Sequence, residues 1–480
     1  MDATQKRLHE EFLENELGTT PDEVVMLSLL PLFTTQFYAL LLRICSLGFL
    51  RRNFWLAITT DTVLQSAPFV LAVTFLSDYV ACIFFTFMSG SVILWMIRHL
   101  SSPKWKRDKK SSSIKRAAVE TPSQVPLMSV ARTHVLFMTS ICILAVDFPS
   151  FPRRFAKTKF SGFSLMDTGV AFFITLAALV SPEAKRKQLH KSLSHLKRVI
   201  SGSLTLVVIG LIRVLTVKGI DYQSPVLEYG LHWNFFFTFA SVKIISAVLY
   251  VLFPAAWDAA FSVALFAVYE LSLQFTDLNA FLHNNDRTGF FAANKEGLTS
   301  LLGYVALYLA AVVTAKQIIY KPRREIREWL GSALSILLVS AAGFVLTYIM
   351  HREISPVSRR LANVSYCLWM FSVASLVLGL LIVFEVLGAL LEDPEHVNAN
   401  TLEVRKKENP DIPNPLLIWN AMNYNAMGLF LFSNLLTGLC NVILQTRAAG
   451  PACCLSVLFL YLFILVIFSL YMYKKKMKVK

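Results

Sequence analysis

The segment that decides the fold runs from Asp147 to Val170 and reads D-F-P-S-F-P-R-R-F-A-K-T-K-F-S-G-F-S-L-M-D-T-G-V. Pro149 and Pro152 disfavour the α region for the residues before them, so this segment is predicted to be a turn or loop. Apolar stretches at 127–147 and 163–180 flank it. Irregular backbone at a membrane boundary is stable only where protein covers it or where it lines a wet cavity. The segment is therefore a candidate site, and the alternative is a loop whose arginines reach lipid head groups.

The composition is that of a membrane protein. The 480 residues are 55% hydrophobic and 16% charged, with a mean hydropathy of +0.55. Apolar runs of the length that crosses a bilayer recur along the whole chain. We predict an all-α polytopic membrane protein with about 13 transmembrane helices. The predicted spans are 25–44, 54–76, 79–97, 127–147, 163–180, 199–217, 232–252, 254–275, 297–315, 331–350, 362–391, 416–444 and 453–473.

The distribution of basic residues predicts the orientation. The net charge is +15, but the bases gather in short loops beside spans, which is typical of topology signals and not of a nucleic-acid-binding surface. The loops after odd-numbered spans and the C-terminal tail hold about 29 Lys and Arg, against about 13 in the N-terminal segment and the loops after even-numbered spans. The positive-inside rule therefore predicts a luminal N-terminus and a cytosolic C-terminus.

The chain is expected to form one membrane domain with short extensions. We predict a luminal segment at 1–24, a transmembrane domain at 25–473 that includes a basic cytosolic loop at 98–126, and a cytosolic basic tail at 474–480. Lys476 and Lys478 in the tail fit the K-x-K-x-x retrieval pattern of endoplasmic reticulum membrane proteins. A plain basic flank of the last span is the alternative interpretation of the tail.

Polar residues concentrate in four loops that the predicted topology places on one face. These loops are 147–157, 219–234, 283–297 and 351–365, and they follow spans 4, 6, 8 and 10. Polar groups that collect on one side of the membrane can converge on one cavity. We therefore expect the four loops to meet.

At these loops the sequence resembles a known family. The motifs, in chain order, are D-F-P-S-F-P-R-R-F-A-K (147–157), S-L-M-D-T-G-V (164–170), D-Y-Q (221–223), E-Y-G-L-H-W-N-F-F-F-T (228–238), A-N-K-E-G (293–297), L-G-Y (302–304), R-R-L-A-N (359–363) and N-L-L-T-G-L (434–439). Together they resemble the inositol acyltransferases of glycosylphosphatidylinositol (GPI) assembly, the PIG-W family and its fungal relatives. The resemblance extends from the fourth span to about residue 440.

The resemblance implies an enzyme of the endoplasmic reticulum membrane. Such an enzyme moves a fatty acyl group, usually palmitoyl, from acyl-CoA to the inositol 2-hydroxyl of glucosaminyl-phosphatidylinositol. Acyl-CoA is then a co-substrate, and we expect no cofactor, no metal cluster and no nucleic-acid partner. The rival interpretations are a polytopic lipid transporter or scramblase, and a non-catalytic subunit of a GPI-assembly complex.

The chemistry of acyl transfer selects candidate catalytic residues. Transfer from a thioester to an alcohol needs a base for the hydroxyl and donors for the developing oxyanion. Asp147 ends an apolar span, where partial desolvation would raise its pKa toward that of a useful base. Lys157 is predicted to hold that carboxylate or to stabilise the oxyanion, although the two residues could instead only pair to anchor the loop. The sequence has no Ser or Cys nucleophile beside a paired His, which favours direct transfer.

The remaining candidates are expected to bind substrate or to brace the site. Arg153 and Arg154 suit phosphate groups, because a guanidinium recognises phosphate with two hydrogen bonds. His232 is the alternative base, and it would share a helical face with Glu228 if a helix began there. Asp167 is expected to cap the fifth span. The full set of candidate substrate-binding residues is Arg153, Arg154, Tyr222, Glu228, His232, Asn234, Arg287, Asn294, Lys295, Glu296, Arg360 and Asn363.

Overall fold

The computed structural model describes residues 18–45, 53–101, 126–185, 192–219, 226–321, 323, 326–391 and 417–479. Over these residues the chain is helical, and the β-type pairing is limited to isolated bridges from Gly18 and Thr19 to Phe163. The longer helices are α2 (Pro21–Ile44), α3 (Phe54–Ala72), α4 (Val80–Leu100), α6 (Pro126–Ala145), α7 (Thr168–Leu179), α8 (Leu193–Gly219), α10 (Phe235–Leu252), α11 (Asp258–Phe275), α14 (Lys295–Thr314), α15 (Ile326–Glu353), α16 (Val364–Leu391), α18 (Ala426–Ile443) and α19 (Pro451–Lys474).

Shorter helical turns connect the long helices. They are η2 (Ser77–Tyr79), η4 (Arg153–Phe155), α9 (Val226–Tyr229), η5 (Ala255–Trp257), α12 (Leu278–His283), α13 (Gly289–Ala293), the π-helical turn η6 (Ala315–Ile319), α17 (Leu417–Tyr424) and η9 (Thr446–Ala448). The sequence explains several helix starts, because polar side chains cap the free N–H groups. Asn53 accepts from Trp55 N at 2.9 Å, and Asn234 accepts from Phe236 N at 3.0 Å.

Eleven helices among the described residues are long and apolar enough to cross a membrane. The all-α polytopic class is therefore confirmed, but the predicted count of thirteen is not. The two predicted spans outside this set are 54–76, which forms α3, and 163–180, which contains the 12-residue α7. The buried face of α3 includes polar side chains, with Asp61 and Gln65 in the protein interior. Within 163–180 the polar loop continues to Asp167, so only the last part of this apolar stretch is helical.

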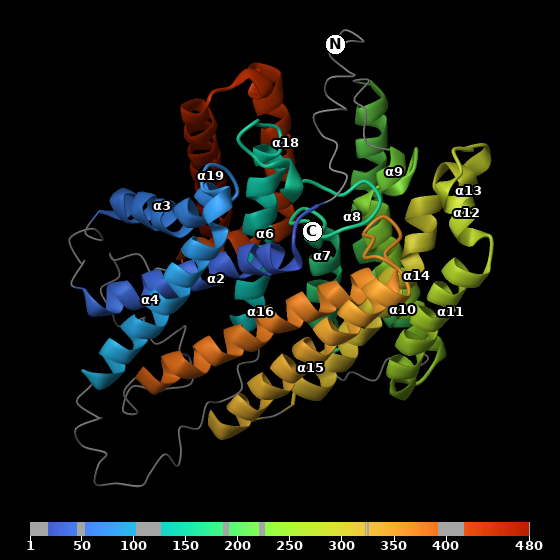
Figure 1. Ribbon diagram of the computed structural model, residues 1–480, viewed down its shortest axis with the longest axis horizontal. Coiled ribbons are helices and arrows are strands. Elements are labelled where there is room, and N and C mark those ends of the chain that lie inside the picture. The colour runs from blue at the N-terminus through green and yellow to red at the C-terminus, as the bar shows by residue number, and fades with distance from the viewer. Residues whose placement is uncertain are drawn as a thin grey trace.

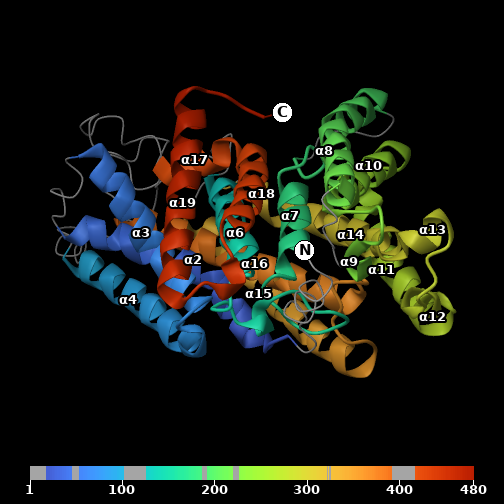
Figure 2. The ribbon, with the colours of Figure 1, turned by 90° about the horizontal axis from the view of Figure 1, so that it is seen from above.

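The helices pack as a bundle with α7 near its centre. Figure 2 shows α7 between the α18–α19 pair and the α8–α10 pair, and α15 and α16 lie side by side in both ribbon views (Figure 1). Small residues let α15 and α16 approach closely, since Ser340 Oγ donates to the carbonyl oxygen of Ser372 at 2.8 Å. A second close approach occurs where α14 passes the turn before α16. A Cβ at Gly303 would clash there with the carbonyl oxygen of Ala362.

Candidate active site

The predicted loop after α6 is irregular and anchored by buried rings. Arg153 lies in the short helix η4, and its Nη2 donates to the carbonyl oxygens of Val146 (2.9 Å) and Phe148 (3.0 Å). Arg153 therefore braces the backbone of the loop from inside, and its predicted contact with phosphate stays a prediction. The rings that fix the loop are fully buried and belong to Phe148, Phe151 and Phe155.

Arg154 ties the loop to two other parts of the chain. Its guanidinium donates to Glu23 at the start of α2 (3.2 and 3.1 Å), and to Asp78 (3.2 Å) and the carbonyl oxygen of Ser77 (2.9 Å) in the α3–α4 connection. Thr19 N also donates to the carbonyl oxygen of Phe163 at 2.7 Å. These contacts hold the loop against the beginning of α2. A phosphate at Arg154 would share the guanidinium with both carboxylates.

Asp147 is a half-buried carboxylate with a neutral partner. Its Oδ2 accepts a hydrogen bond of 2.8 Å from Asn441 Nδ2, which lies in the last turn of α18. Burial raises the pKa of Asp147, while the Asn441 hydrogen bond and the nearby charge of Arg153 offset part of that rise. A raised pKa is the property for which Asp147 was predicted to act as a base. Sequence reasoning missed Asn441, although the motif N-L-L-T-G-L ends only two residues before it.

Lys157 does not pair with Asp147 in this structure. Its Nζ donates to Glu228 Oε1 in α9 at 2.7 Å, and its side chain is 41% exposed. Glu228 also receives Arg359 Nη1 at 3.3 Å, and Arg359 Nε reaches Asp167 Oδ1 at 2.6 Å. Lys157 thus ends a chain of ion pairs that leads into the protein interior. The proposed catalytic roles of Asp147 and Lys157 remain predictions, with separate partners for the two residues.

Asp167 has a different role from the predicted helix cap. It occupies the position before α7, but its side chain makes no capping hydrogen bond to that helix. Its Oδ2 instead accepts from the backbone N (3.2 Å) and Oγ1 (2.6 Å) of Thr158, beside the Arg359 contact. The expectation of a cap was therefore wrong, because a buried guanidinium from a distant turn competes for this carboxylate. Tyr366 OH donates to the Asp167 carbonyl oxygen at 2.7 Å and fixes its backbone.

The pKa values of the two carboxylates that bind Arg359 are displaced in opposite directions. Burial alone would raise the pKa of Glu228, but the charges of Lys157 and Arg359 outweigh it and hold that pKa at about 2. Burial raises the pKa of Asp167, and the Arg359 charge and the Thr158 hydrogen bonds offset it only in part. The two cations therefore favour the charged form of Glu228.

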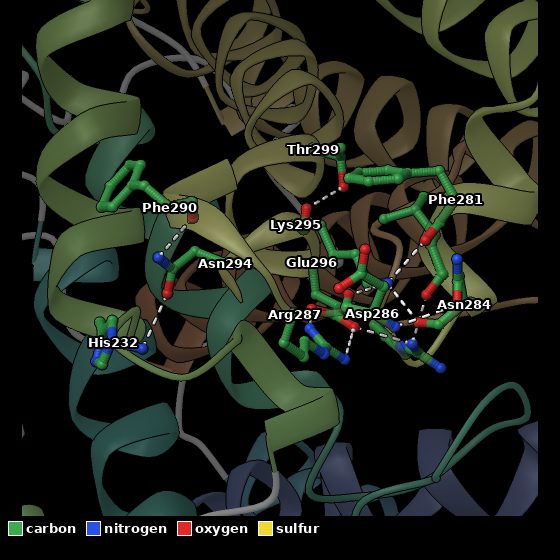
Figure 3. A network of polar contacts seen from close by, with 12 residues as sticks. His232, Phe281, Asn284, Asp286, Arg287, Phe290, Asn294, Lys295, Glu296 and Thr299 are labelled. Atoms are coloured by element: carbon green, nitrogen blue, oxygen red, sulfur yellow. Dashed lines mark hydrogen bonds and ion pairs between the residues drawn. The ribbon is translucent and has the colours of Figure 1, made fainter. Parts of the chain in front are cut away.

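A second cluster joins α14 to the loop after α12 and to the turn before α16 (Figure 3). Glu296 is fully buried and receives Arg287 through two hydrogen bonds of 2.6 and 2.7 Å. Arg360 Nη2 contributes a third contact, at 2.9 Å. The carboxylate is thus shared by two guanidinium groups. The predicted residues Arg287, Glu296 and Arg360 meet, and the contacts favour the bracing role over the binding role.

Lys295 is enclosed by backbone carbonyl groups. Its Nζ donates to the carbonyl oxygens of Phe281 (2.8 Å), Asn284 and Asp286 (3.4 Å) (Figure 3). Its side chain is essentially buried, so the ammonium group holds the segment between α12 and α13 in place. Lys295 therefore braces this segment, and its predicted contact with substrate stays a prediction.

Asn294 links this cluster to the loop before α10. Asn294 Oδ1 accepts from His232 N at 2.9 Å, and Asn294 Nδ2 donates to the carbonyl oxygen of Phe290 at 3.0 Å (Figure 3). Gly230 has φ +115° and passes so close to Asn294 that a Cβ would clash with its backbone. This close approach requires glycine. α9 ends at Tyr229 and α10 begins at Phe235, so the predicted helical face shared by Glu228 and His232 does not exist.

The other predicted residues have local structural contacts or lie elsewhere. The side chain of His232 is exposed, and Asn234 caps α10 while its Nδ2 donates to the carbonyl oxygen of Gly210 at 3.1 Å. Asn363 Nδ2 donates to Ser355 Oγ (3.0 Å) and to the carbonyl oxygen of Pro356 (2.8 Å). Tyr222 lies outside the described residues. Within the described part of the chain, no group of three or more His, Cys, Asp and Glu is placed to hold a metal ion.

The contacts confirm that the four loops converge. Lys157 reaches α9 from the first loop, Arg359 in the fourth loop reaches α9 and Asp167, and Arg360 meets Glu296 in the third. Asn294 in the third loop accepts a hydrogen bond from His232 N in the second, so the third loop also contacts the second. Sequence reasoning missed Arg359 as a site residue, although it precedes Arg360 in the motif R-R-L-A-N.

Fold and site together define a polytopic helical membrane protein with a charge-paired site where four loops meet. The chain belongs to the GWT1 family, whose family model matches residues 5–472. It is 32% identical over 494 residues to the "Glucosaminyl-phosphatidylinositol-acyltransferase PIGW" of Mus musculus, covering 96% of each chain. The protein of the same name from Bos taurus is 33% identical over 512 residues, covering 99% of each chain. The "GPI-anchored wall transfer protein 1" of Yarrowia lipolytica is 32% identical over 393 residues, with 78% of this chain and 77% of the relative covered.

Proposed function

We propose that this protein is an O-acyltransferase of GPI-anchor biosynthesis. It moves a fatty acyl group, palmitoyl in our proposal, from acyl-CoA to the inositol 2-hydroxyl of glucosaminyl-phosphatidylinositol. The relatives named as glucosaminyl-phosphatidylinositol acyltransferases cover nearly the whole chain and support this substrate. In the site, the carrying observation is a half-buried carboxylate of raised pKa, Asp147, on the same loop as the exposed ammonium of Lys157.

The reaction requires one proton transfer and one exchange at the acyl carbon. Asp147 takes the proton of the inositol hydroxyl while that oxygen attacks the thioester carbonyl. Lys157 donates to the oxygen of the tetrahedral intermediate, where negative charge develops. The carbon–sulfur bond then breaks, the CoA thiolate leaves and takes up a proton, and the ester remains on the inositol. These steps need no cofactor to balance atoms and charges.

The protein also has a proposed location and orientation in the membrane. We place the protein in the endoplasmic reticulum membrane, with residues 1–24 in the lumen, a single transmembrane domain at 25–473, and the basic loop at 98–126 and the tail at 474–480 in the cytosol. The excess of Lys and Arg in alternate loops supports this orientation. The four converging loops would then face the lumen or a cavity that opens toward it.

Purified protein tests the function directly. Detergent-solubilised or liposome-reconstituted protein receives palmitoyl-CoA and glucosaminyl-phosphatidylinositol, and mass spectrometry detects the acylated lipid and free CoA. We expect both products in equal amounts from the wild type, and little product from Asp147→Asn. Lipid that crosses the liposome bilayer without acylation would instead indicate a scramblase. Product formation that depends on an added partner protein would indicate a subunit.

A further inference from the structure

Four charged side chains from three segments of the chain form one continuous chain of ion pairs. Its links are Lys157 Nζ to Glu228 Oε1 at 2.7 Å, Glu228 Oε1 to Arg359 Nη1 at 3.3 Å, and Arg359 Nε to Asp167 Oδ1 at 2.6 Å. The side chains become less exposed along it, from 41% at Lys157 and 13% at Glu228 to 5% at both Arg359 and Asp167. Only the lysine end is open to a substrate.

Arg359 is the member that other cations could not replace. One edge of its planar guanidinium donates to Asp167 and a terminal nitrogen donates to Glu228, so two carboxylates are fixed at once. The inner end is anchored in turn, because Asp167 accepts two hydrogen bonds from Thr158 and its backbone oxygen accepts from Tyr366. The position of Glu228 is therefore set by the protein interior and does not depend on Lys157.

From this geometry we infer that Asp167, Arg359 and Glu228 are positioning residues that hold the Lys157 ammonium in place at the point of acyl transfer. The inference rests on the proposed function, in which Lys157 stabilises the oxyanion. A lysine on an exposed loop loses much rotamer freedom when it is held in one place. The pre-formed carboxylate of Glu228 supplies that restraint before substrate arrives, as electrostatic stabilisation of a transition state requires.

The same arrangement leaves Asp147 available as a base. A carboxylate bound to an ammonium group has a lowered pKa and accepts protons poorly. Here Lys157 is neutralised by Glu228, whereas Asp147 is bound to the neutral amide of Asn441. The pKa values of the two carboxylates are displaced in opposite directions, up for Asp147 and to about 2 for Glu228, which suits a division into a base and a positioning residue.

Other charged and titratable groups lie around this chain of ion pairs. They are Arg213 of α8 and Tyr229 of α9 beside Glu228, and Tyr304 of α14 and Tyr366 of α16 beside Arg359. The chain itself contains two anions and two cations, so it is neutral as a unit. Removal of the Glu228 charge leaves two cations against one anion and takes away the acceptor that holds Lys157.

The test measures how firmly Lys157 is held without relying on turnover. Competitive acetylation of the full-length protein in detergent at one fixed pH, read by mass spectrometry, gives the reactivity of Lys157 relative to the other lysines. In Glu228→Gln we expect Lys157 to react severalfold faster, because its Nζ loses the acceptor that lies 2.7 Å away. The value of kcat should fall in the same variant, while KM changes little. Glu23→Gln is the matched control, because it removes a carboxylate from Arg154 on the same loop and should leave the reactivity of Lys157 unchanged.

A second variant covers failure of the first one to accumulate. Glu228→Asp keeps the charge but shortens the reach toward Lys157, so the reactivity of Lys157 should rise by a smaller amount and kcat should be partly retained. An unchanged reactivity of Lys157 in both variants would overturn the inference. A raised reactivity in a protein that makes no product refutes the proposed function alone, and normal product formation with an unchanged reactivity refutes the positioning role alone.

Discussion

Replacement of Asp147 by asparagine isolates the proton-accepting role of this residue. Asparagine keeps the size of the side chain and can still bond to Asn441, whose Nδ2 lies 2.8 Å from Asp147 Oδ2. The substitution therefore removes basicity and leaves the packing of the loop unchanged. General-base catalysis contributes on the order of 10²–10⁴-fold, so kcat should fall by that factor. This loss equals about 3–5 kcal/mol in the activation free energy, since each 1.36 kcal/mol is tenfold.

The pH profile adds a second readout to the same prediction. The base is active when deprotonated, so activity is lost as the pH falls through the pKa of Asp147. Because burial raises that pKa, the acid limb should lie above the ordinary aspartate value of about 3.9. Asn441→Leu removes a hydrogen bond that lowers this pKa. It should therefore move the acid limb to still higher pH while the protein remains folded.

The assay is acylation of glucosaminyl-phosphatidylinositol at saturating palmitoyl-CoA, with thermal unfolding in detergent as the control for folding. Comparable melting temperatures would establish that Asp147→Asn acts on chemistry. Near-normal turnover in a stable Asp147→Asn protein would refute the base assignment, and loss of turnover in His232→Ala would then assign the role to His232. Failure of both variants to accumulate would leave Asp147 as an anchor of the loop and remove the argument for this site.

Three other predictions concern the rest of the site. Lys157→Ala should lower kcat, and the double variant with Asp147→Asn should be little worse than the worse single one, as steady-state kinetics would reveal, because the two act in one step. Glu296→Gln should lower the melting temperature measurably, since it leaves two guanidinium groups without their shared buried carboxylate, a loss of about 3–5 kcal/mol; an unchanged melting temperature would contradict the bracing role. In microsomes, a cysteine at Phe160 should react only after the membrane is permeabilised, whereas one at Met477 should react from outside; the reverse pattern would refute the orientation.

Local patterns predicted the helical class well and the ends of the spans less well. Proline and polar residues between apolar runs indicated the irregular loop after α6, and the structure contains it. The predicted span 416–444 is interrupted at Asn425, whose side chain accepts from Gly428 N at 3.3 Å and starts α18 anew. A hydropathy profile gives little sign of this break, because the helix restarts within one residue.

The pairing of charges could not be predicted from spacing. Asp147 and Lys157 are ten residues apart on one loop, and that proximity suggested that they bind each other. In the structure their partners are Asn441 and Glu228, both from distant segments. Charged side chains on an irregular loop are free to turn in any direction, so neighbours in sequence have no advantage over residues that the fold brings near. Only the packing of helices selects between them.

The contact between Arg359 and Asp167 could not be predicted from spacing either, and it matters for the proposed chemistry. They lie 192 positions apart, and each has a plausible local role, as one of a pair of basic residues and as a helix cap. A buried ion pair is weak evidence for stability, because desolvation of both charges offsets much of their attraction. The buried pair at the convergence of four loops is better explained by its effect on the orientation of Lys157. The pair fixes Glu228, and Glu228 fixes Lys157. The proposed base, Asp147, is left with a neutral hydrogen-bond partner. Exchange of the chain for apolar residues could therefore preserve the fold and still abolish acyl transfer.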